Sequence, residues 1–62
     1  MRITYRNQVW ELQGQRRVRD AIEEVGLEPY TVLAMRDGKL LAEDAMLAED
    51  DDVRLVAVIS GG

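Results

Sequence analysis

One segment of this 62-residue chain has apolar residues at helical spacing, and the segments on either side of it have the patterns of strands. The helix is predicted from about Arg16 to Gly26, because a glycine just past the last turn readily adopts the left-handed conformation that closes a helix. Its apolar stripe consists of Val18, Ala21, Ile22 and Val25. A chain this short can build only a small core, so the helix must pack across a sheet made by the other segments.

The predicted strands form two hairpins and a closing strand. Residues 1–6 alternate between apolar and polar, and residues 8–12 follow the turn residue Asn7. Residues 31–36 and 39–41 flank Asp37-Gly38, a dipeptide typical of a tight hairpin turn. Residues 53–59 form the last strand, after a polar segment in which Met46 and Leu47 are expected to be anchored in the core. The order strand, strand, helix, strand, strand, strand predicts an α+β, β-grasp fold with a mixed sheet of about five strands.

The charged residues of the predicted helix oppose its dipole. Arginines at 16, 17 and 19 lie near the start, and glutamates at 23 and 24 lie near the end. Each exposed charge of this kind costs about 0.3 to 1 kcal/mol at low salt, which burial of the apolar stripe can offset. The arginines form either a solvated face or a recognition surface.

Composition excludes several classes of function. The chain has no Cys and no His, so we expect no disulfide, no bound metal or other cofactor, and no catalysis by the chain itself. Its net charge of −4 and the acidic run from 49 to 52 argue against nucleic acid as a direct partner. The acidic run is either a solvated turn or a device that steers the chain to a basic partner. No apolar stretch is long enough for a membrane helix, and we expect a soluble, cytoplasmic protein.

The third and last predicted strands are apolar on both faces, although one helix can cover only one face. Alternation assigns Val32, Ala34, Val53, Leu55 and Ala57 to the core. It leaves Leu33, Met35, Val56 and Val58 as an apolar patch on the open face, bordered by Arg36 and Arg54. A patch with an apolar centre and a charged border predicts a partner interface. Two alternatives remain open, since the loop before the last strand or a second copy of the chain could cover the patch.

The chain ends in three small residues directly after the predicted closing strand. Ser60, Gly61 and Gly62 can extend about 10 Å, and glycine permits backbone angles closed to other residues. We therefore expect a folded domain over residues 1–59 and a flexible tail over residues 60–62 that presents the carboxylate of Gly62 in a narrow pocket. Terminal glycines also occur as frayed chain ends. The Gly61-Gly62 dipeptide therefore indicates a function only because it follows directly after the predicted closing strand.

Nearly the whole chain resembles the ThiS/MoaD family of ubiquitin-like sulfur carriers, and within it the TtuB-type carriers of tRNA thiolation. The resemblance is carried by residues 17–29, residues 32–36 and the terminal residues 59–62, of which the last are the most specific. Gly61 and Gly62 match the reactive tail of the family. The first hairpin departs from the family, because Tyr5 and Trp10 are bulkier than expected. Ser60 stands where ubiquitin has arginine, which disfavours activation by an enzyme of the eukaryotic ubiquitin type.

The resemblance implies a carrier that contributes a carboxylate and no catalytic side chain. An adenylyltransferase related to ubiquitin-activating enzymes would use ATP to adenylate Gly62, and sulfur would then replace AMP to give a thiocarboxylate. The recipient would be an enzyme of tRNA thiolation, or of thiamine or molybdopterin synthesis. Two alternatives are a protein modifier joined through Gly62 to target lysines, for which Lys39 would be the sole internal acceptor, and a non-covalent β-grasp interaction domain.

Overall fold

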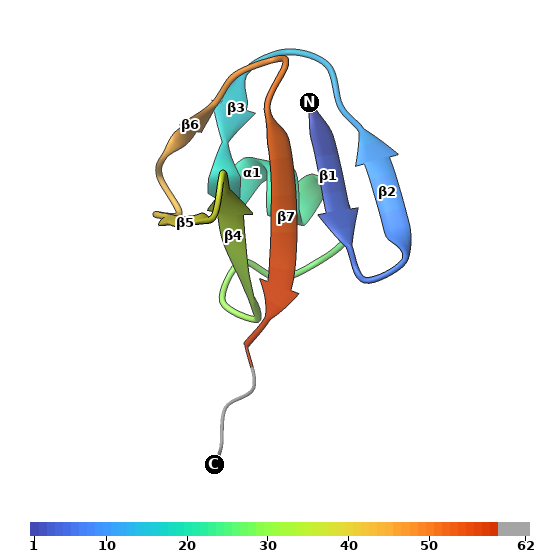
Figure 1. Ribbon diagram of the computed structural model, residues 1–62, viewed down its shortest axis with the longest axis vertical. Helices are drawn as coiled ribbons and strands as arrows, with labels where there is room; N and C mark the ends of the chain where they lie inside the picture. Colours follow the sequence, from blue (N-terminus) through green and yellow to red (C-terminus); the bar gives the residue numbers. More distant parts are fainter. Residues whose placement is uncertain (59–62) are drawn as a thin grey trace.

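The computed structural model, which describes residues 1–58, has a five-stranded mixed sheet with one helix across one of its faces (Figure 1). The strands lie in the order β2-β1-β7-β4-β5, with β1 parallel to β7 and the other neighbours antiparallel. This arrangement confirms the predicted β-grasp fold. The sheet strands are β1 (Arg2–Tyr5), β2 (Gln8–Glu11), β4 (Val32–Arg36), β5 (Lys39–Leu41) and β7 (Asp52–Ala57). The other elements are α1 (Val18–Glu24) and a separate two-stranded sheet of β3 (Arg16–Arg17) and β6 (Met46–Leu47).

The two hairpin turns form where the sequence predicts them. Asp37 and Gly38 have φ values of 55° and 78°, the positive angles that a tight two-residue turn requires. In the first hairpin Arg6, rather than Asn7, adopts a positive φ of 55°. The guanidinium carbon of Arg6 lies 5.3 Å from the centroid of the Tyr5 ring, so a cation–π contact accompanies this turn.

The helix begins two residues later than predicted. The backbones of Arg16 and Arg17 pair with β6 instead of continuing the helix. The first helical N–H groups then find acceptors in the segment between β5 and β6, because Val18 donates to the carbonyl of Ala45 and Arg19 donates to the carbonyl of Glu43, each at 2.9 Å. Backbone carbonyls therefore serve where a side-chain cap is usual, and no local sequence signal marks this start.

The helix ends at the predicted glycine. Gly26 has a φ of 88°, its N–H donates to the Glu23 carbonyl at 3.0 Å, and the N–H of Leu27 donates to the Ile22 carbonyl at 3.1 Å. This pair of bonds is the Schellman motif, which satisfies carbonyls at the end of a helix. Within residues 1–58, no helix is long and apolar enough to cross a membrane.

The core lies between α1 and the face of the sheet that α1 covers. Its buried side chains are Met1, Ile3, Val18, Ala21, Ile22, Val32, Ala34, Leu47, Val53 and Leu55. Trp10 and Leu12 of the first hairpin are half-buried and pack against this cluster. Of the two expected anchors in the polar segment, Leu47 is fully buried, whereas Met46 is 56% exposed. The prediction for Met46 was wrong because the two residues of β6 point in opposite directions.

Three of the helix charges that oppose the dipole take part in ion pairs. Arg16 forms an ion pair with Glu24, and a nitrogen of the Arg19 guanidinium lies 3.6 Å from a carboxylate oxygen of Glu43. Exposed pairs of this kind contribute about 0 to 1 kcal/mol each, so they offset the unfavourable placement without driving helix formation. Burial of the apolar stripe remains the principal stabilising effect.

Candidate functional site

In the sequence, the predicted reactive tail follows strand β7. Strand β7 lies in the middle of the sheet between β1 and β4, and it ends at Ala57. The N–H of Val58 then donates to the carbonyl of Thr31 at 2.9 Å, which ties the chain to the fold one residue beyond the strand. Ser60, Gly61 and Gly62 lie outside the described residues. The chain thus leaves the sheet from its central strand, at the end of the molecule opposite the start of β7 (Figure 1).

The open face of the sheet carries the predicted apolar patch. Leu33 lies directly opposite Val56, and both are exposed, at 44% and 40%. Val58 is 43% exposed, and Met35 is half-buried next to Arg54. The segment between β5 and β7 does not cover this face, because β6 pairs with β3 and Leu47 enters the core on the helix side. The structure therefore excludes the alternative in which the segment before the last strand covers the patch. Burial of the patch by a second copy of the chain stays a prediction.

Sequence reasoning missed two residues of this face. Val9 of β2 and Leu40 of β5 are 58% and 63% exposed. The registers place them in one row across the sheet, which reads Val9, Thr4, Arg54, Met35, Leu40. Strict alternation within each predicted hairpin would have found them, since residues directly opposite each other point to the same face.

Arg54 stands in the middle of this row. It is exposed, and its guanidinium forms no ion pair within residues 1–58. A hollow of about 380 Å³ between Arg54, Met35 and the β4–β5 turn lies toward the start of β7. A second hollow of about 370 Å³, which Arg54, Met35 and Val56 help to line, lies toward the end of β7. A cation between two hollows in an apolar face suits a partner that presents a carboxylate.

Arg36, the other cation predicted to border the patch, lies elsewhere. Its position in β4 alternates with that of Met35, so its side chain starts on the helix side of the sheet. A guanidinium nitrogen of Arg36 lies 2.6 Å from a carboxylate oxygen of Asp51. The placement of Arg36 at the border of the patch was wrong, because this ion pair holds it beside the segment before β7.

Sequence comparison places the chain among known proteins. The sequence pattern of the ThiS family matches residues 2–62. The chain belongs to the ThiS family. It is 39% identical over 62 residues to the sulfur carrier protein TtuB of Thermus thermophilus, and the alignment covers 100% of this chain and 94% of that protein. The family resemblance stated from the sequence is confirmed.

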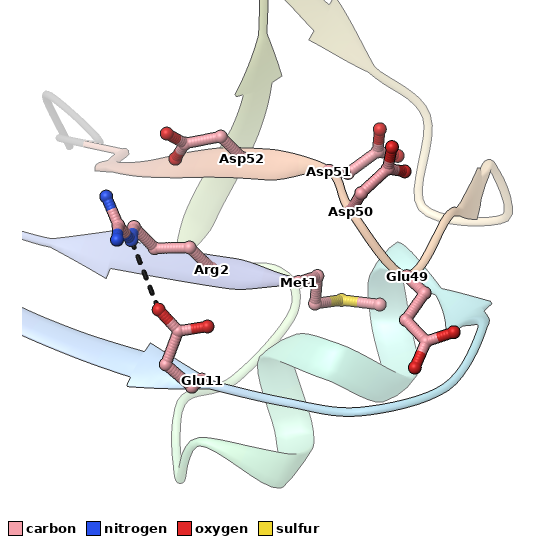
Figure 2. A pocket seen from close by; sticks show the side chains of 7 residues that line it. All are labelled: Met1, Arg2, Glu11, Glu49, Asp50, Asp51 and Asp52. Atoms are coloured by element: carbon pink, nitrogen blue, oxygen red, sulfur yellow. Dashed lines mark hydrogen bonds and ion pairs between the residues drawn. The ribbon is translucent and has the colours of Figure 1, made fainter.

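The acidic run of this ThiS-family chain surrounds the start of β7. Figure 2 shows that the side chains of Glu49, Asp50 and Asp52 point in different directions around Met1 and Arg2 and do not converge on one point. Arg2 itself is paired with Glu11 of β2 at 3.2 Å. In residues 1–58, no group of three or more potential ligands is placed to hold a metal ion. The exposed members of the run remain candidates for steering a basic partner.

Asp51 differs from its neighbours because it has a structural role. Its carboxylate accepts hydrogen bonds from the N–H of Ala48 at 2.8 Å and from Arg36 at 2.6 Å. The bond from the Ala48 backbone, followed by the bond from Arg36, lowers the pKa of Asp51 below its usual value. The carboxylate therefore closes the turn before β7 and links this turn to Arg36 at the end of β4.

Replacing Asp51 by Asn is expected to destabilise the fold in a pH-dependent way. A depressed pKa in the folded state contributes stability above the unfolded pKa, and this contribution disappears as the pH falls through the folded value. The variant should unfold at lower urea concentration than the native chain at pH 7, and the difference should shrink below about pH 4. Asp50→Asn is the matched control and should follow the native curve. Equal unfolding midpoints for Asp51→Asn and Asp50→Asn at pH 7 would contradict this role.

Proposed function

We propose that this chain is a sulfur carrier that other enzymes use as a substrate, with the carboxylate of Gly62 as the working group. The family match extends to residue 62, and a sulfur carrier from Thermus thermophilus aligns over the full length of the chain. The observation that carries the proposal is the exit of the chain from the central strand, next to the open apolar face. Four residues follow Val58, enough to reach at most about 14 Å into a partner.

The proposed chemistry has two steps. An oxygen of the Gly62 carboxylate attacks the α-phosphorus of ATP on an adenylyltransferase, and pyrophosphate leaves. Hydrosulfide then attacks the acyl carbon and AMP leaves with the bonding electron pair, and loss of the S–H proton gives a thiocarboxylate. Activation is required because a carboxylate is a poor electrophile until it carries a good leaving group. Glycine at the last two positions keeps side chains away from the reacting carbon.

The open face is the proposed docking surface for the adenylyltransferase. Leu33, Met35, Val56 and Val58 would form the apolar centre of this interface, with Arg54 as its charged element. Apolar centres exclude water around a few strong contacts, which is the usual anatomy of a specific interface. Docking here would hold the chain at Val58 while residues 59–62 enter the ATP site of the adenylyltransferase.

The proposed recipient is a tRNA-thiolating enzyme in the cytoplasm, in preference to enzymes of thiamine or molybdopterin synthesis. The full-length similarity to TtuB favours this assignment, because the resemblance is to carriers of the tRNA-thiolation type. The carrier would meet the recipient protein rather than the RNA itself, since its net charge of −4 disfavours contact with phosphates.

ATP–pyrophosphate exchange by the adenylyltransferase of the same organism tests the proposed activation step. The native chain and Ser60→Ala should support comparable exchange, because both retain the terminal carboxylate at full reach. A chain lacking Gly62 should lower the exchange rate by about 100-fold or more, since the carboxylate then falls short of the α-phosphorus. Exchange that survives deletion of Gly62 would rule out adenylation at this residue.

A further inference from the structure

The hollow toward the end of β7 is lined by two arginines. Its volume is about 370 Å³, and its lining includes Arg6 as well as Arg54. The parallel pairing of β1 with β7 brings the turn after β1 to this end of the sheet, where Tyr5 lies opposite Leu55 (Figure 1). Arg6 comes from this turn and Arg54 from the middle of β7. Two cationic residues that are distant in sequence therefore border one hollow, at the end of the sheet where the chain leaves it.

The backbone at Arg6 is unfavourable for an arginine. Arg6 has a φ of 55°, whereas Asn7, the second residue of the turn, does not have a positive φ. Glycine is the usual residue at the first position of such a turn, because a side chain disfavours a positive φ. Local backbone preference therefore does not account for arginine at this position, which directs attention to its side chain.

The ring of Tyr5 holds the guanidinium of Arg6 in place. The guanidinium carbon lies 5.3 Å from the centroid of the ring. Tyr5 is half-buried and packs against the core, so its ring offers a fixed surface. A cation that already lies over an aromatic ring loses little further freedom when a partner binds it. The Arg6 side chain is therefore preorganised beside the hollow.

The positive charge at this hollow is not neutralised by the described part of the chain. Within residues 1–58, neither Arg6 nor Arg54 forms an ion pair, and no acidic residue lines the hollow. The chain as a whole has 12 acidic and 8 basic residues, so acidic side chains are abundant elsewhere. The arginines that have carboxylate partners are Arg2, Arg16, Arg19 and Arg36. The hollow is thus suited to carboxylates that come from a partner.

The start of β7 has the opposite character. Arg2 lies between Glu11 and Asp52 in the strand registers, and its guanidinium is paired with Glu11 (Figure 2). One cation between two carboxylates leaves a net negative charge at this end. An acidic segment of a partner is therefore favoured toward the end of β7 and opposed at its start.

We propose that the adenylyltransferase lays an acidic segment across the hollow, and that carboxylates of this one segment pair with Arg6 and Arg54 together. The inference rests on the proposed function and adds Arg6 to its docking surface. Met35 and Val56 also line the hollow and provide apolar contacts beside the charge pairs, which help to exclude water from them. Attraction at one end of β7 and repulsion at the other would dock the chain in one direction only.

Isothermal titration calorimetry of the full-length chain with the adenylyltransferase of the same organism, without ATP, tests the contact. Arg6→Gln should raise Kd about tenfold, because a carboxylate of the partner is left unpaired at the interface. Circular dichroism should show this variant folded, since loss of an exposed cation–π contact costs little.

Arg17→Gln is the matched control for Arg6→Gln. It makes the same change in net charge, and Arg17 lies exposed in β3 without an ion pair in residues 1–58. It should change Kd less than twofold. Equal Kd values for Arg6→Gln and the native chain, or an equal rise in the two variants, would overturn the proposal. Amide shifts at Arg6 that follow the concentration of the chain alone would assign the hollow to a second copy and would also overturn it.

The double variant Arg6→Gln/Arg54→Gln tests whether the two arginines bind one segment. It should raise Kd by less than the product of the two single factors, because a segment already released from one arginine has less to lose at the other. Arg54→Gln/Arg17→Gln should follow the product of its single factors. If the factors for Arg6 and Arg54 also multiply, the two residues make separate contacts and the shared segment is wrong.

Pyrophosphate exchange separates failure of this inference from failure of the proposed function. If the native chain binds the enzyme and supports exchange while Arg6→Gln binds equally well, only this inference is wrong. If the native chain supports no exchange, the proposed function is wrong, and the inference that rests on it is wrong as well.

Discussion

Reversal of the charge at Arg54 is expected to lower kcat/KM for adenylation of the chain by about 100-fold. Arg54 is exposed at the centre of the open face, between two hollows and in register with Thr4 and Met35. In the proposed complex Arg54→Glu would bring a carboxylate against the groups that receive the guanidinium, and the loss of one buried charge pair at an interface costs about 2 to 5 kcal/mol. Steady-state kinetics with the adenylyltransferase of the same organism measure this effect.

Arg17→Glu is the control for that experiment. It makes the same change in net charge, and Arg17 lies exposed in β3, away from the open face. Both variants should unfold near the native urea midpoint, because neither residue forms an ion pair within the described part of the chain. We expect kcat/KM for adenylation to fall only in the Arg54→Glu variant. An equal loss in both variants would mean that overall charge, and not the open face, governs recognition.

Replacing Leu47 by Ala is expected to cause the largest loss of stability from the segment between β5 and β7. Leu47 is completely buried under the core side of the sheet. Truncation of a buried leucine costs about 3 kcal/mol or more. A chain of this length has a total stability of roughly 3 to 9 kcal/mol, at about 0.05 to 0.15 kcal/mol per residue. The variant should therefore be partly unfolded at 37 °C, as measured by circular dichroism during urea and thermal unfolding.

Met46→Ala provides the comparison, because Met46 is the other residue of β6 and is 56% exposed. Its unfolding free energy should stay within about 0.5 kcal/mol of the native value. If both truncations lower the unfolding free energy equally, the segment would stabilise the fold through its backbone pairing with β3 rather than through the Leu47 side chain.

The sequence predicted the sheet well because its signals are local. Alternation and the Asp37-Gly38 turn defined the second hairpin, and Gly26 defined the end of the helix. The start of the helix escaped prediction because it depends on carbonyls of Glu43 and Ala45, which are distant in sequence. The pairing of β3 with β6 escaped for the same reason, since two-residue strands have no pattern of their own.

In the candidate site, too, features with a local sequence signal were predicted, and features that depend on residues distant in sequence were not. The open face followed from apolar residues on both faces of two strands, and Leu33, Val56 and Val58 are exposed there. Arg36 was misplaced because its ion pair with Asp51 joins residues 15 positions apart in sequence. The hollow that Arg6 and Arg54 share could not be predicted, because it arises from the parallel pairing of β1 with β7, which joins residues distant in sequence.

The most direct test of sulfur transfer to Gly62 is intact mass spectrometry of the chain after expression in its own host with an active sulfur supply. For a sulfur carrier, we expect a fraction of the native chain to show a mass gain equal to replacing one oxygen by sulfur. Fragmentation should locate this gain at Gly62, and a chain lacking Gly62 should not show it. If the native chain shows no such gain while Gly62 is found joined to lysines of other proteins, the chain is a protein modifier and the sulfur-carrier account is wrong.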